Sequence, residues 1–414
     1  MQSTRFLRRA ALATAVALFS ACDMLEVSNP GPQSDESLNT ASAMAGLVTG
    51  MSFDLSRAMD ATAQETAIMA DELYHGGSYA NEGLFNRGIV RPDLVNGMWG
   101  SMHRARWVAE AGIERMKEVL DTGFDTNPLS ARAYIYAGLA NRMLGELTCQ
   151  AVYDGSAAQD YKTHFSRAET QFTEAIRLAG GLTGAIRDSL LRVANGGRAS
   201  VRAWQNKWAE AATDAQLVPT NYVFNAFFST NTGAENNDLV FETNNRLEYT
   251  VYLTPWALVF RDPRVPWDTV KTSAGAVQNG QNGRTPFFRQ RKHNGLGADI
   301  ALVKGTEMLM LRAEAALRAN DVPGAMTLIN QQRAFYNTTS TPLPAITGIT
   351  TAADAWPILQ KERGAVLWLE NRRFWDLRRW NAEPAPIKHT FLDNRDKCIP
   401  ISENEMLSNP NLRP

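Results

Sequence analysis

Paired amphipathic helices with small residues at their contact positions are the feature that most constrains this fold. Residues 131–147 and 161–179 carry apolar side chains at steps of three and four, the period of a helix that buries one face. The second stretch places Ala168, Phe172 and Ala175 on that face. Small residues allow two helices to approach closely, while the phenylalanine fills the space between them. The pattern therefore predicts a packed helix pair.

Two further helix pairs are predicted along the chain. The Ala-x3-Phe-x2-Ala spacing of the first pair, and the twelve residues between Ala313 and Ala325 in the last, resemble the tetratricopeptide repeat. Such pairs stack into a solenoid because each buries its apolar face against its neighbours. We therefore predict a mainly α fold of tetratricopeptide-like helical pairs with little β structure. The additional helices are expected at 185–195, 198–217, 307–318 and 323–335.

The remaining periodicity divides the chain into two helical regions. The first covers about 37–218 and includes a long helix from Pro92, a favoured first helical residue, to about Leu120. The second covers about 299–380. We expect both regions to share one core, so that 37–414 folds as a single domain.

The segment 219–298 interrupts the helical regions and differs from them in composition. It is rich in Asn, Gly, Thr and aromatic residues, and only Asp238–Thr243 looks like a short strand. Because long structured insertions in compact domains are commonly functional, we expect this loop-rich insertion to face a ligand. Residues 381–414 show little helical pattern and are predicted to be extended, apart from one turn in which Ser402 and Glu405 fit a capping box.

The N-terminus has the pattern of an export signal. Three arginines precede the uncharged apolar run 10–19, which is too short to span a bilayer. The tetrapeptide Phe-Ser-Ala-Cys at 19–22 resembles a lipobox, with phenylalanine in place of the usual leucine. We predict that 1–21 is a signal peptide, that Cys22 is lipidated and that 22–36 is a tether. Ordinary cleavage at the same place, leaving a free Cys22 thiol, is the alternative.

Two cysteines remain once Cys22 carries lipid. Cys149 and Cys398 would then be the only pair in an oxidising compartment, where disulfides persist. We predict a bond between them, and two buried free thiols are the alternative. They are too far apart in sequence to suggest a metal site, and no histidine lies at ligand spacing from either.

Charge and motifs argue against two broad classes of function. The formal net charge of −1 becomes −4 when the three arginines of the signal peptide are lost, whereas nucleic-acid partners usually require a basic face. The sequence lacks the zinc-protease, serine-hydrolase and phosphate-loop motifs. We therefore expect no enzyme, no cofactor and no nucleic acid. A lipid-anchored glycoside hydrolase is the least favoured alternative, since paired carboxylates cannot be recognised from spacing.

Three blocks in the C-terminal third, within 309–333, 362–380 and 399–412, carry residue patterns that resemble those of the SusD/RagB family. They match L-x-x-R-A-E-A…A-x3-I-N-x-x-R, then E-R…E-G-x-R-x-x-D-L-x-R-W, and finally P-I-P-x-x-E…N-P-x-L. Asn371 stands at the usual glycine of the second block, and Ser402 at the second proline of the third. The matching residues are Leu309, 312–315, Asp321, Ala325, Ile329-Asn330 and Arg333; Glu362-Arg363 and 369–380; and 399–402, Glu405 and 409–412.

The resemblance implies both a fold and a function. It implies a mostly helical, SusD-like domain on the outer-membrane surface that caps a TonB-dependent transporter of the SusC type. It also implies capture of an oligosaccharide, or in some members a peptide, and its delivery to the channel without catalysis. The alternative is a helical-repeat scaffold for protein partners in the cell envelope. Exposed, convergent aromatic side chains in the insertion would favour the ligand-binding function over the scaffold.

Saccharides are bound by aromatic faces together with amide, carboxylate and guanidinium groups, on loops held by a rigid scaffold. Two loops meet this description, 71–87 and the insertion. Ordinary packing remains the alternative for each aromatic side chain. The candidate ligand-binding residues are Asp71, Tyr74, His75, Tyr79, Tyr249, Tyr252, Trp256 and Trp267.

The second block also predicts a core helix in which Val366, Leu369, Arg373 and Leu377 share one face. Charges at three- and four-residue spacing, such as Arg373 and Asp376, would then form ion pairs along that helix. These charges would serve folding, so replacing Arg373 or Asp376 is expected to cause a folding defect.

Overall fold

The computed structural model describes residues 35–413. Its contacts divide the chain into two units, Met1–Ala43 and Met44–Pro414. The described part of the first unit contains only the short 3-10 turns Asp35–Leu38 and Ala41–Ala43. The predicted signal peptide, the lipidation site Cys22 and nearly all of the predicted tether lie outside the described residues. The second unit contains every element considered below.

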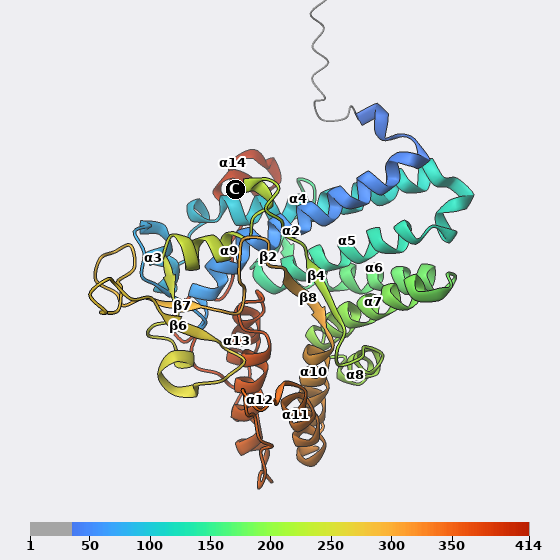
Figure 1. The fold of residues 1–414 in the computed structure, drawn as a ribbon. Helices are drawn as coiled ribbons and strands as arrows, with labels where there is room; N and C mark the ends of the chain where they lie inside the picture. The colour runs from blue at the N-terminus through green and yellow to red at the C-terminus, as the bar shows by residue number, and fades with distance from the viewer. Residues whose placement is uncertain (1–34, 414) are drawn as a thin grey trace, which may run out of the picture. The chain divides into compact units, whose positions relative to one another are not determined.

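Helices that follow one another in the chain stack side by side through the second unit, from α2 to α12 (Figure 1). Each helix contacts the preceding and following members of the stack, as tetratricopeptide-like pairs do. The predicted mainly α fold is therefore confirmed. The stacked helices are α2 (Met44–Met69), α4 (Asn96–Leu120), α5 (Pro128–Leu147), α6 (Thr163–Gly180), α7 (Gly184–Trp204), α8 (Trp208–Gln216), α10 (Gly305–Arg318), α11 (Val322–Tyr336) and α12 (Ala352–Val366).

The contact positions predicted for the first helix pair lie in the core of the stack. Ala168, Phe172 and Ala175 of α6 are fully buried. A Cβ atom on Gly138 of α5 or on Gly197 of α7 would lie 2.8 or 2.4 Å from the Phe172 ring. Phe172 therefore fills a space that exists because its neighbours have no side chain, as the sequence pattern predicts.

The predicted break between 195 and 198 is wrong, because α7 continues without interruption to Trp204. Gly196 and Gly197 remain helical since packing outweighs their low helix propensity. A Cβ atom on Gly196 would lie 2.4 Å from the side chain of Val303, so both glycines admit a neighbouring side chain. The pair α7–α8 exists, with its turn nearer the C-terminus than the sequence indicates.

The strand predicted at Asp238–Thr243 is also wrong. The segment forms a single helical turn, α9 (Asp238–Val240), followed by a π-helical turn over Phe241–Asn245. The buried side chain of Asn237 accepts a hydrogen bond from the Val240 amide at 3.1 Å. This N-cap satisfies a backbone donor of the first turn and favours helix over strand.

Within residues 35–413, strands occur as four short antiparallel pairs. The pair β4–β8 joins the beginning and the end of the insertion, so the intervening loops leave and rejoin the helical stack at one place. The pairs are β1 (Tyr74–His75) with β5 (Tyr249–Thr250), β2 (Gln150–Ala151) with β3 (Gln159–Asp160), β4 (Val223–Ala226) with β8 (Ile300–Lys304), and β6 (Trp267–Thr269) with β7 (Phe288–Gln290).

The single helix predicted across the second family block is wrong, because a turn separates α12 from α13 (Arg373–Asn381). Leu369 and Asn371 have φ angles of 56° and 57°, the left-handed region that glycine and asparagine enter most readily. Asn371 therefore suits a position where the family usually has glycine. Its buried amide also donates to Thr62 Oγ1 and accepts from Thr66 Oγ1, each at 2.7 Å.

The predicted Arg373–Asp376 pair is wrong, because Arg373 pairs across the fold and the partner of Asp376 within α13 is Arg379, at 2.8 Å. The Arg373 guanidinium binds the carboxylate of Asp71 through two hydrogen bonds of 2.7 and 2.8 Å. Asp376 also accepts from Arg363 Nε at 2.7 Å. Both cross-fold pairs are buried, so the block ties α12, α13 and the end of α2 together.

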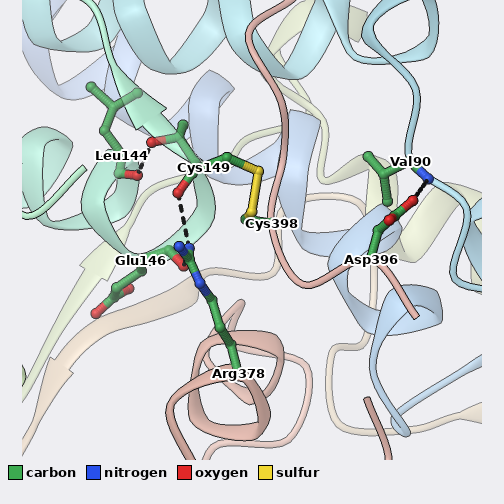
Figure 2. The surroundings of a disulfide bond; sticks show 8 residues. Val90, Leu144, Glu146, Cys149, Arg378, Asp396 and Cys398 are labelled. Atoms are coloured by element: carbon green, nitrogen blue, oxygen red, sulfur yellow. Dashed lines mark hydrogen bonds between the residues drawn. A yellow bond between two sulfur atoms is a disulfide. The ribbon is translucent and has the colours of Figure 1, made fainter. Parts of the chain in front are cut away.

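A disulfide joins Cys149, just after α5, to Cys398 near the end of the chain (Figure 2). The Cα atoms are 5.0 Å apart, and the bond closes a span of 249 residues. The Cys149 amide donates to the carbonyl oxygen of Ile399 at 2.8 Å, and Arg378 Nη1 donates to that of Thr148 at 2.9 Å. The pairing predicted from the cysteine count is thus present and lies within a hydrogen-bonded junction.

The C-terminal segment is mostly irregular, as expected. Its short helix α14 (Glu403–Ser408) begins where the sequence predicts a capped turn, since Ser402 Oγ accepts from the Glu405 amide at 3.3 Å. Within residues 35–413, no helix combines the length and the apolar character needed to cross a membrane.

Candidate ligand-binding site

The two loops selected from the sequence as ligand-facing meet in the structure. Strand β1 from the first loop pairs with β5 from the insertion, placing Tyr74 opposite Thr250 and His75 opposite Tyr249. Strand β1 contacts α3 (Ala80–Asn86), which follows it in the chain and is labelled in Figure 1. Residues from distant parts of the sequence therefore form one surface layer.

This layer continues from β5 to β7 and β6. The Val251 amide donates to the carbonyl oxygen of Phe288 at 2.8 Å, and Thr250 Oγ1 accepts from the Phe288 amide at 2.8 Å. Strand β7 then pairs with β6, where Trp267 lies opposite Gln290. The strands thus lie in the order β1, β5, β7, β6, and side chains of both predicted loops can contribute to one surface.

Two glycines allow the loops of this layer to approach closely. A Cβ atom on Gly77 would lie 1.7 Å from Glu248 Oε2, and one on Gly280 would lie 2.4 Å from the carbonyl oxygen of Gly76. The Asn282 amide donates to that same carbonyl oxygen at 3.1 Å. The glycine- and asparagine-rich stretch around 280 is therefore a packing loop that supports the layer.

Three aromatic rings and one guanidinium group form what we call the aromatic cluster: Tyr252, Arg261, Trp267 and Phe288. The Trp267 and Phe288 rings are stacked, with centroids 4.8 Å apart and planes 5° from parallel. Tyr252 meets Phe288 edge to face at 5.1 Å. All three rings are half-buried, so each is held by packing and still reaches solvent. Tyr252 and Trp267 were predicted as ligand-binding residues, and the structure brings them together.

Arg261 is the adjustable member of the aromatic cluster. Its guanidinium lies 5.2 Å from the centre of the Trp267 ring, and its backbone is left-handed with φ 47°. Within residues 35–413 this exposed guanidinium has neither an ion-pair nor a hydrogen-bond partner. It can therefore turn its donors toward a ligand without breaking another interaction. The Asp268–Arg289 ion pair, at 3.0 Å, lies on the opposite face of the β6–β7 ribbon, because neighbouring strand residues alternate in direction.

Three of the predicted ligand-binding residues are instead buried in the core. Asp71, Tyr249 and Trp256 are 4 %, 1 % and 0 % exposed. Asp71 is bound by Arg373, and the Trp256 ring packs against Phe260 with centroids 5.2 Å apart. These side chains anchor the loops to the helical stack, so their assignment as ligand contacts is corrected.

A second polar group, the Tyr79 cluster, consists of Tyr79, Glu242, Arg246 and Glu248. Tyr79 donates to Glu242 Oε1 at 3.4 Å, and the Arg246 guanidinium lies 5.0 Å from the Tyr79 ring centre. Burial and the nearby Glu248 raise the pKa of Glu242 to about 7, although Arg246 opposes the shift. The cluster therefore presents a hydroxyl, a carboxyl and a guanidinium close to the first loop. Burial lowers the pKa of neighbouring His75, which favours its neutral imidazole.

No trio of His, Cys, Asp or Glu side chains in the described part of the chain is arranged to hold a metal ion. What the layer offers is aromatic faces, hydroxyls and charged hydrogen-bonding groups at a partly exposed surface. This combination suits binding of a polar ligand with apolar C–H faces.

Glu72, next to Asp71 at the base of the first loop, gives a pH-dependent prediction. It is buried, and burial raises its pKa to about 8 although its Oε1 accepts from the Leu369 amide at 2.7 Å. The raised pKa stabilises the folded state at low pH, and this contribution is lost as pH rises through about 8. Glu72→Gln keeps the acceptor and cannot ionise. We therefore expect the Tm advantage of the variant over the parent to grow between pH 6 and pH 9 in thermal melts.

The exposed Glu114 provides the control for this experiment, since its side chain is 67 % exposed. Glu114→Gln should differ from the parent by the same small amount at both pH values. A Glu72→Gln variant that also showed a constant difference would mean that the buried carboxyl does not hold its proton near neutrality.

Two members of the site were not predicted from the sequence, Phe288 and Arg261. Phe288 sits in a short strand of three residues whose surroundings give little periodicity, although the adjacent Phe287-Phe288 pair marks an aromatic concentration. A hollow of about 510 Å³ elsewhere on the insertion was also missed; Phe53 of α2 and Phe227 after β4 help to line it. Its aromatic residues come from separate elements, so local sequence carries no sign of it.

Comparisons with known proteins identify the fold. Residues 289–411 match the family model described as the SusD family. A SusD superfamily protein from Bacteroides vulgatus ATCC 8482 matches with a TM-score of 0.67 at 14 % identity, over 89 % of this chain and 97 % of that chain. These matches confirm the SusD/RagB resemblance and the tetratricopeptide-like helical fold. No curated protein sequence matches significantly.

Two solved structures with this fold are named for the glycans they bind. A laminarin-binding SusD-like protein matches with a TM-score of 0.64 at 14 % identity, covering 90 % of this chain and 99 % of that one. A chitin-binding SusD homolog from Flavobacterium johnsoniae matches with a TM-score of 0.64 at 13 % identity, covering 84 % of this chain and 89 % of that one. At these identities, the matches concern the fold alone.

Proposed function

Since residues 289–411 carry the SusD family segment and the compact unit has the SusD fold, we propose that this protein captures an oligosaccharide and delivers it to a SusC-like TonB-dependent transporter. It acts as a binding protein without catalysis, held to the outer membrane by lipid on Cys22. The sequence features of the N-terminus support the anchor, and the family resemblance supports the transporter partner.

The observation that carries the proposal is the aromatic cluster of Tyr252, Arg261, Trp267 and Phe288. A pyranose ring has apolar C–H faces and polar edges, so it is bound best where an aromatic surface adjoins hydrogen-bonding groups. The Trp267–Phe288 stack supplies a rigid aromatic surface. Arg261 supplies N–H donors that form no hydrogen bond with another side chain of residues 35–413.

The wider layer extends the contact beyond a single sugar unit. Strand β1 places Tyr74 and His75 in the same layer as the aromatic cluster, and Tyr79 follows β1 at the start of α3. These three side chains are half-buried and therefore positioned by their surroundings. In this proposal the aromatic cluster binds one unit and the first loop contacts its neighbours along the chain. Binding to a preformed surface limits the conformational entropy lost on association.

Transfer to the channel is proposed to follow from the anchor. A lipidated Cys22 with a tether would hold the binding unit near the transporter mouth, so that a captured glycan is already at high local concentration. Each acyl chain of a diacylglycerol on Cys22 contributes roughly 0.8 kcal/mol per buried CH₂ group, and two chains together give stable attachment without a spanning helix.

Replacing Trp267 by alanine is expected to weaken oligosaccharide binding about tenfold or more, because the variant loses the ring that stacks on Phe288. Arg261→Ala should weaken binding less and should leave Tm unchanged, since Arg261 is exposed. We would measure affinity by calorimetry with laminarin and chitin oligosaccharides and on a glycan array.

Phe335→Ala is the matched control, since Phe335 is an aromatic residue 46 % exposed on α11 and outside the strand layer. It should bind every glycan as the parent does. Equal affinities of parent and Trp267→Ala for all bound glycans would reject the aromatic cluster as the binding surface. Release of new reducing ends by the parent would reject a purely binding role.

A further inference from the structure

Trp107 stands apart from the other tryptophans of this protein. It lies on α4 and is 56 % exposed, whereas the other nine are buried or half-buried. An exposed indole presents a large, rigid aromatic face on which a ligand can stack. Trp107 belongs to the helical stack and contributes nothing to the strand layer described above.

Two hollows flank Trp107, with volumes of about 370 and 360 Å³. Both are lined by Trp107, Arg106 and Asp154, so these three residues form the ridge between them. The first hollow extends to Arg167 and Gln171 on α6, beyond Arg106 and Glu110. Each hollow is large enough for a single sugar ring, and the indole lies between them.

The ridge rests on a network of charged side chains that already bind one another. Arg106, which is 3 % exposed, binds Asp154 through Nη2 and Glu110 through Nη1, each at 2.7 Å. Glu110 also accepts from Arg167 at 2.8 Å and from Gln171 at 2.9 Å. Two guanidiniums and two carboxylates balance each other, so the network offers fixed donors and acceptors without net charge.

A histidine side chain also lines the second hollow. This residue is His103, and its Nε2 atom is buried with no hydrogen-bond partner among the described residues. Arg106 and Asp154 also line this hollow, so an incoming hydroxyl would meet groups of both kinds. A polyanion gains nothing from a balanced network, whereas a neutral polyhydroxylated ligand can both donate and accept there.

We propose that Trp107 is the platform of a second saccharide-binding site, located on the helical stack. A neutral hexopyranose chain lies across the indole with one unit in each hollow, and its hydroxyls bind the Arg106 network. The inference rests on the proposed function, since it assigns this site the same class of ligand. Two sites on one molecule would favour long glycans over short ones, because the second contact is intramolecular once the first has formed.

The test compares four proteins on an array of neutral glycans that includes laminarin and chitin oligosaccharides of different lengths: the parent, Trp107→Ala, Trp267→Ala and the double variant. Trp107→Ala is expected to weaken binding of the longest glycans about tenfold and to change binding of the shortest ones less. The double variant should lose binding of both. Because Trp107 is exposed, its replacement should leave Tm unchanged.

Ile186→Ala on α7 is the control for an exposed apolar side chain of the helical stack, since Ile186 is 42 % exposed. Unchanged glycan binding by Trp107→Ala would overturn the second site, and so would loss of a co-purified membrane protein in that variant without loss of glycan binding. If Trp107→Ala weakens binding and Trp267→Ala does not, the second site stands and the aromatic cluster fails. A parent that binds no glycan overturns both proposals.

Discussion

Replacing Arg373 by methionine is expected to lower the free energy of unfolding by about 3–5 kcal/mol, because it leaves a carboxylate buried without its partner. Arg373 is 2 % exposed and binds both oxygens of Asp71, at 2.7 and 2.8 Å. Its remaining donor, Nη1, reaches the carbonyl oxygen of Gln360 at 2.9 Å. Methionine is unbranched and uncharged and fills much of the same space. The free energy of unfolding that is lost therefore reflects the missing ion pair more than lost packing.

The same variant has a pH signature. Burial would raise the pKa of Asp71, but Arg373 more than offsets this and holds it below its ordinary value of 3.8. In the parent, this pair stabilises the fold above about pH 4 and less at lower pH, where Asp71 becomes protonated. Without Arg373, the buried carboxyl takes up a proton more readily. In urea unfolding, the free energy of unfolding that Arg373→Met loses relative to the parent should therefore be smaller at pH 4 than at pH 7.

Arg91→Met is the matched control, since Arg91 also binds an aspartate, Asp93, at 2.7 Å, but with 53 % and 43 % of the two side chains exposed. Such surface pairs contribute about 0–1 kcal/mol. Adding Asp71→Asn to Arg373→Met removes the buried charge and should recover part of the loss. If Arg373→Met and Arg91→Met lowered the free energy of unfolding by the same small amount, the Arg373–Asp71 pair would contribute no more to stability than a surface pair.

The ion pair also shows where local sequence is informative and where it is not. The helices could be predicted because their apolar residues recur every three or four positions. The spacing of Ala168, Phe172 and Ala175 therefore marks a buried helix face from the local sequence alone. Arg373 and Asp71 are separated by about three hundred residues, and nothing near either one identifies the partner. The structural role of Arg373 was therefore predicted correctly, but its partner was not: the sequence indicated Asp376, and the structure has Asp71.

The aromatic residues of the insertion show a similar limit. Trp256 and Trp267 are both tryptophans in a loop-rich segment, yet Trp256 is fully buried and Trp267 is half-buried. The burial of each ring depends on which elements cover it, and those elements come from elsewhere in the chain. Trp256, for example, packs close to Gly364 of α12. Residue type indicated the loops of the candidate site, while pairing of β1 with β5 determined which side chains share a surface.

Backbone conformation accounts for one further difference. Helical periodicity appeared to continue through 366–377, but α12 ends at Val366 and the left-handed residues Leu369 and Asn371 separate it from α13. An isolated asparagine is a weak turn signal, since it also occurs within helices. The family comparison was the better guide, because a position usually occupied by glycine indicates a conformation that most residues avoid.

Removing the Cys149–Cys398 disulfide is expected to lower the free energy of unfolding by about 5 kcal/mol, because the bond closes a span of 249 residues and so restricts the unfolded chain. The native contacts around it do not depend on sulfur. The Ile399 amide donates to the carbonyl oxygen of Leu147 at 2.7 Å, and replacing both cysteines by serine removes neither of these backbone groups. The fold should therefore survive with its helical content intact and unfold at a lower urea concentration.

The experiment uses a chain with Cys22→Ser, so that no third thiol can exchange with the pair. Urea unfolding of this parent, with and without a reductant, is compared with that of Cys149→Ser/Cys398→Ser. Reductant should lower the stability of the parent to about that of the double variant, and the double variant itself should not respond. If the parent were equally stable with and without reductant, the two cysteines would be free thiols. The join between α5 and the C-terminal segment would then depend on its hydrogen bonds alone.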